Sequence, residues 1–254
     1  MGTSILHLAQ NMRHSKNHIN MKFTLLSLFL LFICSSSIGQ YDTLINTSLE
    51  NMNNGLYAKA IDNCTKAITI NSNRKEAYYN RGIAYVNTKS YNKAISDFTK
   101  AISIDGTMAK MYYNRGTAYS FNNENKKALQ DFNKAIELDP TDALAWHNRS
   151  RLKLTLVDLP GALTDINKAI ELDSSFIDAY NVKANIHAQN KNLDKALINF
   201  NKVLELDPEN AAGYFNRGLI NAYLANKNEA CSDMENALKR GMTQAAEAIE
   251  KICK

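Results

Sequence analysis

Residues 76–105 read EAYYNRGIAYVNTKSYNKAISDFTKAISID, and residues 110–139 read KMYYNRGTAYSFNNENKKALQDFNKAIELD. The two segments match when the chain is aligned with itself so that Glu76 falls on Lys110. Further segments that begin at residues 144, 178 and 212 fall into the same register. Chance does not produce so many aligned matches, so the sequence indicates a structural unit that repeats along the chain with a constant period.

Each unit is predicted to form two helices that pack against each other. Tyr78, Gly82 and Tyr85 recur at i, i+4 and i+7, which places them on one face of a first helix. Ala94 and Phe98 have the same spacing in a second helix. Because Gly82 and Ala94 are small, the two helices can approach closely at these residues. Proline, the strongest helix breaker, occurs only 3 times in 254 residues.

This pattern of aromatic and small residues resembles the tetratricopeptide repeat (TPR) family over residues 41–240. The resemblance implies an all-α fold, a right-handed superhelical solenoid of antiparallel helix pairs. The six expected units are residues 41–74, 75–108, 109–142, 143–176, 177–210 and 211–240. Residues 241–254 are predicted to form a helix that caps the last unit, because terminal repeats must cover an exposed apolar face.

The N-terminal residues are predicted to lie outside the repeats. Residues 21–40 read MKFTLLSLFLLFICSSSIGQ, in which Lys22 precedes an apolar run from Phe23 to Ile33. Such a run is too short to span a membrane comfortably but suits a signal peptide over residues 21–39, cleaved after Gly39. Residues 1–20 are then a leader, or Met21 is the true start.

The expected location is therefore periplasmic or secreted, with no membrane span in the mature chain. A lipoprotein attached through Cys34 is a less favoured alternative, because the bulky Ile33 precedes the cysteine where a small residue is required. An uncleaved membrane anchor is less favoured still.

Charge and composition argue against several classes of function. The net charge is +5, but residues 1–40 contain three basic residues and no acidic one, so 27 basic and 25 acidic residues remain. This balance argues against binding to nucleic acid or to an anionic membrane. His147 and His187 have no carboxylate or cysteine at a ligand spacing, and no catalytic grouping stands out. We therefore expect no metal, no cofactor and no enzymatic activity.

Basic and acidic residues occur together at two places in the repeat. The basic residues are Arg81, Arg115, Arg149 and Arg217, and the acidic residues sixteen positions later are Asp97, Asp131, Asp165 and Asp233. Repeat five instead has Lys183 with Asn199. We interpret these residues as exposed ion pairs between the two helices of a repeat, each contributing roughly 0–1 kcal/mol. A basic stripe for an anionic partner is the alternative.

The resemblance also implies where a partner would bind, because ligands of this family mostly occupy the concave strip formed by the first helices. The corresponding residues are Tyr79, Asn80, Lys110, Tyr113, Asn114, His147, Asn148, Arg151, Asn181, Phe215 and Asn216. Amide side chains can donate to and accept from a peptide backbone at once, and aromatic side chains are enriched at binding hot spots. Charges on the strip are few and mixed.

These features predict a non-enzymatic scaffold that binds a protein or an extended, largely neutral peptide. A purely structural spacer in an envelope assembly is one alternative. An enzyme with its site in the groove is another, and it is less favoured.

The last cysteines are predicted to form a disulfide. Cys231 occupies a repeat position that is apolar elsewhere and that should face the next unit, here the capping helix. Cys231 and Cys253 lie about equally far from the Gly241–Met242 turn along antiparallel helices, and an exported protein can keep such a bond. Two reduced cysteines in the core of the cap are the alternative.

Overall fold

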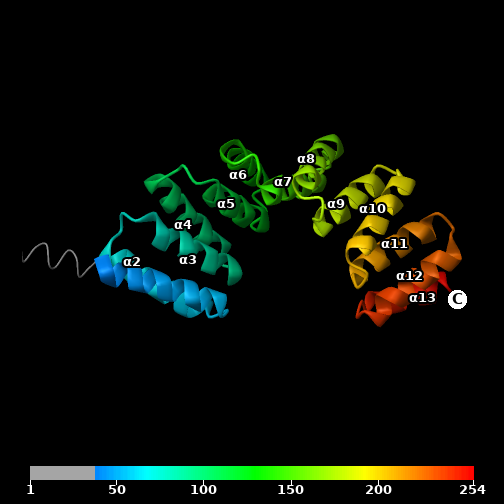
Figure 1. Cartoon of the computed structure of the whole chain (residues 1–254), viewed down its shortest axis with the longest axis horizontal. Helices are drawn as coiled ribbons and strands as arrows, with labels where there is room; N and C mark the ends of the chain where they lie inside the picture. The colour runs from blue at the N-terminus through cyan, green and yellow to red at the C-terminus, as the bar shows by residue number, and fades with distance from the viewer. Residues whose placement is uncertain (1–37) are drawn as a thin grey trace, which may run out of the picture. The chain divides into compact units, whose positions relative to one another are not determined.

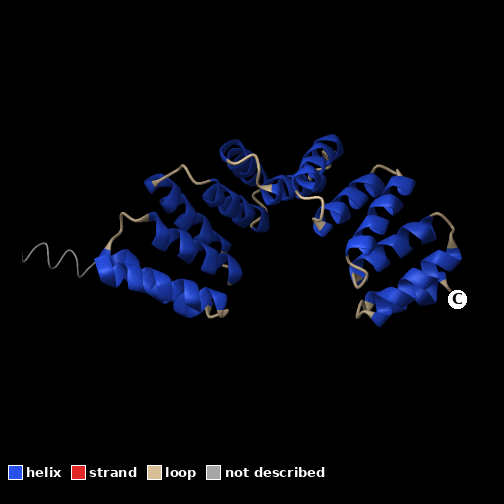
Figure 2. Ribbon diagram, viewed as in Figure 1, coloured by secondary structure: helices blue, strands red, loops and turns tan. Residues whose placement is uncertain are grey.

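The computed structural model describes residues 38–254, and all regular structure in this range is α-helical (Figure 1; Figure 2). The predicted leader and all but the last two residues of the predicted signal peptide lie outside the described residues. Within residues 38–254, no helix is both long enough and apolar enough to cross a membrane. The all-helical character predicted from the sequence is therefore confirmed.

The chain divides into two compact units, one ending at Ile104 and the other beginning at Asp105. The described part of the first unit has a helix over residues 38–53, followed by α2 (Tyr57–Ile70), α3 (Lys75–Asn87) and α4 (Tyr91–Ile104). The second unit has α5 (Ala109–Phe121), α6 (Asn125–Leu138), α7 (Ala143–Thr155), α8 (Leu159–Leu172), α9 (Ile177–Gln189), α10 (Leu193–Leu206), α11 (Ala211–Tyr223), α12 (Lys227–Lys239) and α13 (Gln244–Ile252).

In the second unit, each helix packs against the helices that precede and follow it in sequence. Among helices that are not adjacent in sequence, first helices of successive repeats touch: α5 touches α7, and α7 touches α9. This is the linear packing of an α-solenoid, in which each repeat contacts its neighbours. The first helices α5, α7 and α9 therefore lie next to one another along one side of the unit.

The turn between the two helices of a repeat has the same conformation throughout. A residue with positive φ occurs once in every repeat, at Gly55, Lys89, Asn123, Val157, Lys191 and Ala225. At α7 the Val157 N–H donates to the Leu154 carbonyl at 3.0 Å, and the Asp158 N–H donates to the Lys153 carbonyl at 2.9 Å. This is the Schellman motif, which satisfies the last carbonyls of a helix. A left-handed residue favours glycine, yet Gly55 is the only glycine of the six.

Close contact between the two helices of a repeat depends on a pairing of small with large residues. A Cβ added to Gly82 would lie 2.7 Å from the Phe98 ring, so the glycine is required beside this phenylalanine. Repeat four has Ser150 at the glycine position and the smaller Ile166 at the phenylalanine position, and both are buried. The Ser150 hydroxyl donates to the Ala162 carbonyl at 2.7 Å. The departures from the repeat pattern thus compensate one another.

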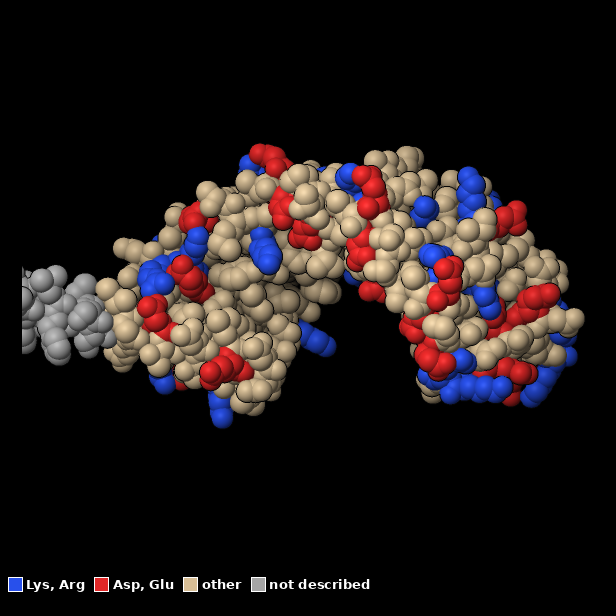
Figure 3. All heavy atoms as spheres, in the orientation of Figure 1, with Lys and Arg blue, Asp and Glu red and all other residues tan. Residues whose placement is uncertain are grey.

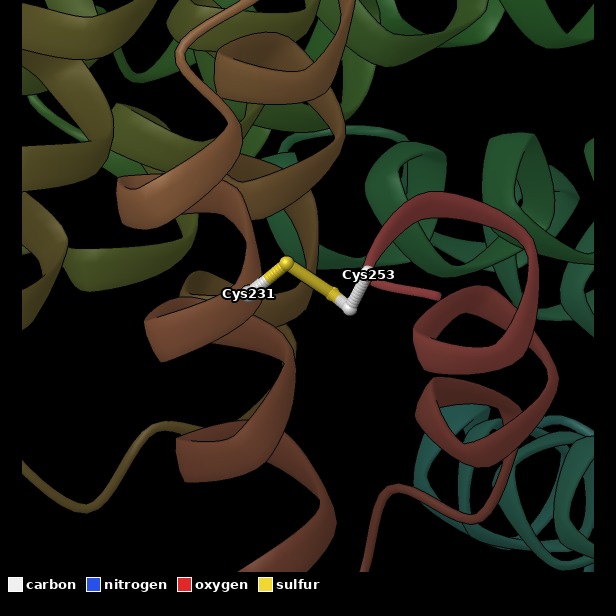
Figure 4. The surroundings of a disulfide bond; sticks show 2 residues. All are labelled: Cys231 and Cys253. Carbon is white, nitrogen blue, oxygen red and sulfur yellow. A yellow bond between two sulfur atoms is a disulfide. The ribbon is translucent and has the colours of Figure 1, made fainter.

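The C-terminal helix covers the last repeat. α13 packs on α12. Met234 and Ala237 of α12 form a fully buried cluster with Ala245 of α13. A disulfide joins Cys231 of α12 to Cys253, which directly follows α13 (Figure 4). The bond closes a segment with a sequence separation of 22 residues and fixes the cap to the solenoid.

Candidate functional site

Acidic and basic side chains are interspersed over the molecular face drawn in Figure 3. Neither sign forms a continuous patch on this face. Within residues 38–254, no group of three or more His, Cys, Asp or Glu side chains could hold a metal ion. The candidate site is therefore sought among neutral polar and aromatic residues on the first helices.

In the first unit, the two predicted strip residues are largely packed against the protein itself. The Tyr79 ring is half-buried, with its centroid 5.9 Å from that of Phe98. Asn80 is only 7% exposed. Little of the Asn80 amide is therefore accessible to a ligand in this structure.

In the second unit, two predicted strip residues on different repeats meet directly. Asn148 Nδ2 donates to the Tyr113 hydroxyl at 2.7 Å, so the amide on α7 is held by the tyrosine on α5. The Tyr113 ring packs near Phe132 with centroids 6.1 Å apart. Burial raises the pKa of Tyr113, so its hydroxyl stays protonated at neutral pH. The contact orients Asn148 before any ligand arrives.

A cavity of about 90 Å³ lies beside this contact. Its walls come from the first helices of repeats three and four, with one ring from α6: Thr117, Ser120, Phe121, Phe132, Asn148, Arg151, Leu152 and Thr155. Asn148 and Arg151 were predicted from the sequence. Thr117, Ser120, Phe121 and Thr155 were not. Ser120 and Phe121 lie three and four residues after Thr117 on α5, and Thr155 lies four residues after Arg151 on α7, so these spacings mark a shared face on each helix. The cavity thus combines hydroxyls, one amide, one guanidinium and aromatic surface.

His147, another residue of the predicted strip, is buried. It is 6% exposed, and its ring centroid lies 4.8 Å from that of Phe176. Burial, helped by the positive charge of Arg151, lowers its pKa to about 4, although Asp178 opposes part of this shift. Within the described residues, no hydrogen bond of good geometry reaches either ring nitrogen. His147 is therefore a neutral imidazole in the core, and little of its ring is accessible to a ligand.

The remaining strip residues differ in how accessible they are. Lys110 on α5 is exposed, and Asn114 is half-buried. Asn181 on α9 is half-buried, with an oxygen that is shielded from solvent and has no hydrogen-bond partner among the described residues. Phe215 on α11 packs against the core beneath the cap, whereas Asn216 beside it is half-buried. The α5–α7 part of the strip encloses a cavity together with an oriented amide.

The predicted ion pairs are present, but they are not the exposed pairs that we expected. Each arginine makes two charge-assisted hydrogen bonds to its aspartate: Arg81–Asp97 at 2.7 and 2.8 Å, Arg115–Asp131 at 2.7 and 2.8 Å, Arg149–Asp165 at 2.7 and 2.7 Å, and Arg217–Asp233 at 2.9 and 2.6 Å. All four aspartates are buried. Removing one partner of a buried pair leaves a desolvated charge, so such a substitution should cost more than the roughly 0–1 kcal/mol expected for an exposed pair.

Comparison with known proteins identifies the repeat. The tetratricopeptide repeat family model matches residues 76–108, 109–142 and 177–210. A search of curated proteins found no significant match. Among solved structures, YrrB, described as a TPR protein with an unusual peptide-binding site, is 25% identical, with a TM-score of 0.59 over 74% of this chain and 97% of its own.

Two further solved structures show the fold alone. A tetratricopeptide repeat protein from Parabacteroides merdae is 21% identical, with a TM-score of 0.69 over 79% of this chain and 80% of its own. PilF from Pseudomonas aeruginosa is 15% identical, with a TM-score of 0.73 over 85% of this chain and 99% of its own. The resemblance inferred from the sequence is thus confirmed: the chain carries tetratricopeptide repeats and folds as an α-solenoid.

Proposed function

We propose that this protein is a non-enzymatic scaffold that binds an extended, largely neutral peptide segment of a partner protein. The observation that carries the proposal is the cavity between α5 and α7, where Asn148 is oriented by Tyr113 beside the exposed ring of Phe121. An oriented amide can pair with a peptide backbone, and an aromatic surface adds contact area. The fold supports the proposal, because tetratricopeptide repeats in general bind proteins or peptides.

The chemistry of the cavity favours a neutral ligand. Arg151 is the only charged side chain in its lining, and the other polar groups are hydroxyls and an amide. Binding should therefore depend only weakly on salt, because few charges are neutralised on association. YrrB supports the choice of a peptide as the ligand, since it combines a similar fold with a peptide-binding site.

A peptide selected from a display library against the purified protein provides the test. Changing Asn148 and Thr155 together to Ala should weaken binding at least tenfold, which corresponds to about 1.4 kcal/mol. Changing Asn236 and Thr164 to Ala removes the same side-chain types from exposed or half-exposed places on α12 and α8 and should leave affinity unchanged. Equal affinity of both variants, with helical circular dichroism retained, would place the binding site elsewhere.

We further propose that the protein is exported to the periplasm or secreted. The signal-like segment over residues 21–39 supports this proposal, and so does the disulfide, because such bonds persist chiefly in oxidising compartments. N-terminal sequencing of the natural protein should begin at or within a few residues of Gln40. A protein that retains Met1 or Met21 and is found in the cytoplasm would contradict export.

A further inference from the structure

Repeat five lacks the ion pair that the other well-formed repeats contain. Lys183 replaces the arginine, and Asn199 replaces the aspartate. Asn199 is 7% exposed, and its Nδ2 donates to the Lys195 carbonyl at 2.7 Å. This repeat has therefore lost its internal carboxylate but has kept a basic residue at the paired position.

Three basic side chains lie around the place where the aspartate of the other repeats is missing. Lys183, His187 and Lys195 line a cavity of about 380 Å³ together with Leu163, Asn167, Ile198 and Asn199. No Asp or Glu is among these residues, and within the described part of the chain no ion pair reaches Lys183. Burial lowers the pKa of Lys183. Burial also lowers the pKa of His187, and the charges of Lys183 and Lys195 add to this effect.

Repeat four shows what normally occupies this place. There Lys153 stands at the position of His187, and its Nζ lies 2.8 Å from Asp165 Oδ2. The same carboxylate also receives two hydrogen bonds from Arg149. The backbone geometry of a repeat therefore suits a carboxylate held between two basic side chains, and repeat five presents such side chains without one.

Apolar surface adjoins the basic cavity. A second cavity, of about 480 Å³, shares Leu163, His187 and Lys195 with the first and adds an apolar wall of Val157, Leu159, Pro160 and Ile186. Val157 is 72% exposed, and Ile198, which lines the basic cavity, is 65% exposed. An acidic side chain bound at the lysines would thus have room for an aliphatic neighbour on this wall. A peptide matches this combination better than a free inorganic anion does.

We propose that Lys183, His187 and Lys195 bind an aspartate or glutamate side chain of a partner's acidic peptide segment, which replaces the missing internal carboxylate of repeat five. The site lies on α8, α9 and α10 and shares no residue with the α5–α7 cavity. It is therefore a second binding surface, and it does not depend on the function proposed above. Lys183 and Lys195 supply charge-assisted hydrogen bonds, and the neutral His187 ring can donate one more through its N–H.

The probe is an acetylated, fluorescently labelled octapeptide that contains two Asp–Leu dipeptides, with Gly and Ser at the remaining positions. The control twin has Asn in place of each Asp. Fluorescence anisotropy should show binding of the Asp peptide and at least tenfold weaker binding of the Asn twin. Lys183→Gln should cost a similar factor, as expected for the loss of a hydrogen bond to a charged group. The matched control is Lys239→Gln, which removes an exposed lysine from α12.

Asn199→Asp gives the sharpest test, because it restores the internal carboxylate of the other repeats. We expect this variant to fold, to unfold at a higher temperature than the natural protein, and to bind the Asp peptide at least tenfold more weakly. Equal binding of the two peptides, or full binding by Asn199→Asp, would overturn the site. Inorganic phosphate that binds at Lys183 when the Asp peptide does not would overturn the assignment of the ligand as a peptide.

Discussion

Arg149 on α7 and Asp165 on α8 are joined by two parallel hydrogen bonds, from Nε to Oδ2 and from Nη2 to Oδ1, each 2.7 Å long. Asp165 is 1% exposed, and Lys153 approaches the same carboxylate. The pair therefore neutralises charge inside the helix pair rather than on the surface.

Asp165→Asn should destabilise the protein by about 3 kcal/mol, because Arg149 and Lys153 would keep their charges without a carboxylate. Urea unfolding followed by circular dichroism measures the change. Asp194→Asn is the matched control, since Asp194 is exposed at the start of α10, and it should change stability by less than about 0.5 kcal/mol. Equal effects of the two substitutions would mean that burial of the pair has no energetic consequence.

Val157 adopts a left-handed conformation with φ of 64°, although its side chain is β-branched. Such a residue costs roughly 1–2 kcal/mol relative to the right-handed region, and glycine does not. Val157 is also 72% exposed, so little packing is lost with its side chain. Val157→Gly should raise the free energy of unfolding by about 1 kcal/mol. In contrast, Gly55→Val at the equivalent turn should lower the free energy of unfolding. If urea unfolding showed that Val157→Gly destabilises the protein and Gly55→Val stabilises it, the assigned turn conformation would be contradicted.

The Cys231–Cys253 disulfide should stabilise the cap by restricting the unfolded chain. For a sequence separation of 22 residues, the chain-entropy description gives roughly 3 kcal/mol. Thermal unfolding with and without reductant measures this contribution, and the double variant with both cysteines changed to Ser should lose the response. Intact mass should rise by about two daltons on reduction. An unchanged mass would show that the bond does not form.

His147 should make stability depend on pH. Its pKa is about 4 in the folded protein, below its ordinary value of 6.5, so between these values the unfolded chain binds more protons. Stability from the neutral imidazole is therefore complete above about pH 6.5 and falls as the pH drops toward 4. His147→Phe should flatten this part of the stability profile relative to the natural protein. An identical slope in both proteins would show that His147 titrates normally.

The sequence was sufficient to predict the helix pairs, the arginine–aspartate pairing and the approach of Cys231 to Cys253, because all three follow from the constant period of the repeat. The pairing of Ser150 with Ile166 does not follow from the repeat pattern. The pattern compares equivalent positions of different repeats, whereas the packing constraint acts between the two helices of one repeat.

The strip was less predictable than the fold. Repeat position indicates which face a residue lies on, but it does not give the depth at which neighbouring side chains bury it. Asn80 and His147 lie on the first helices and are nevertheless buried, whereas Thr155 faces a cavity. The left-handed turn was missed for a related reason: only Gly55 among its six residues carries the expected side chain.

Photo-crosslinking tests the central claim most directly, because it reports contact between the α5–α7 cavity and a bound peptide. A photoreactive phenylalanine derivative replaces Phe121, an exposed ring that lines the cavity and has nearly the same shape, or Tyr223, an exposed ring at the same repeat position on α11. After illumination with the peptide selected for binding, mass spectrometry should find crosslinked peptide in the Phe121 variant and only background in the Tyr223 variant. Equal crosslinking at both positions, or crosslinking at Tyr223 alone, would contradict a binding site between α5 and α7.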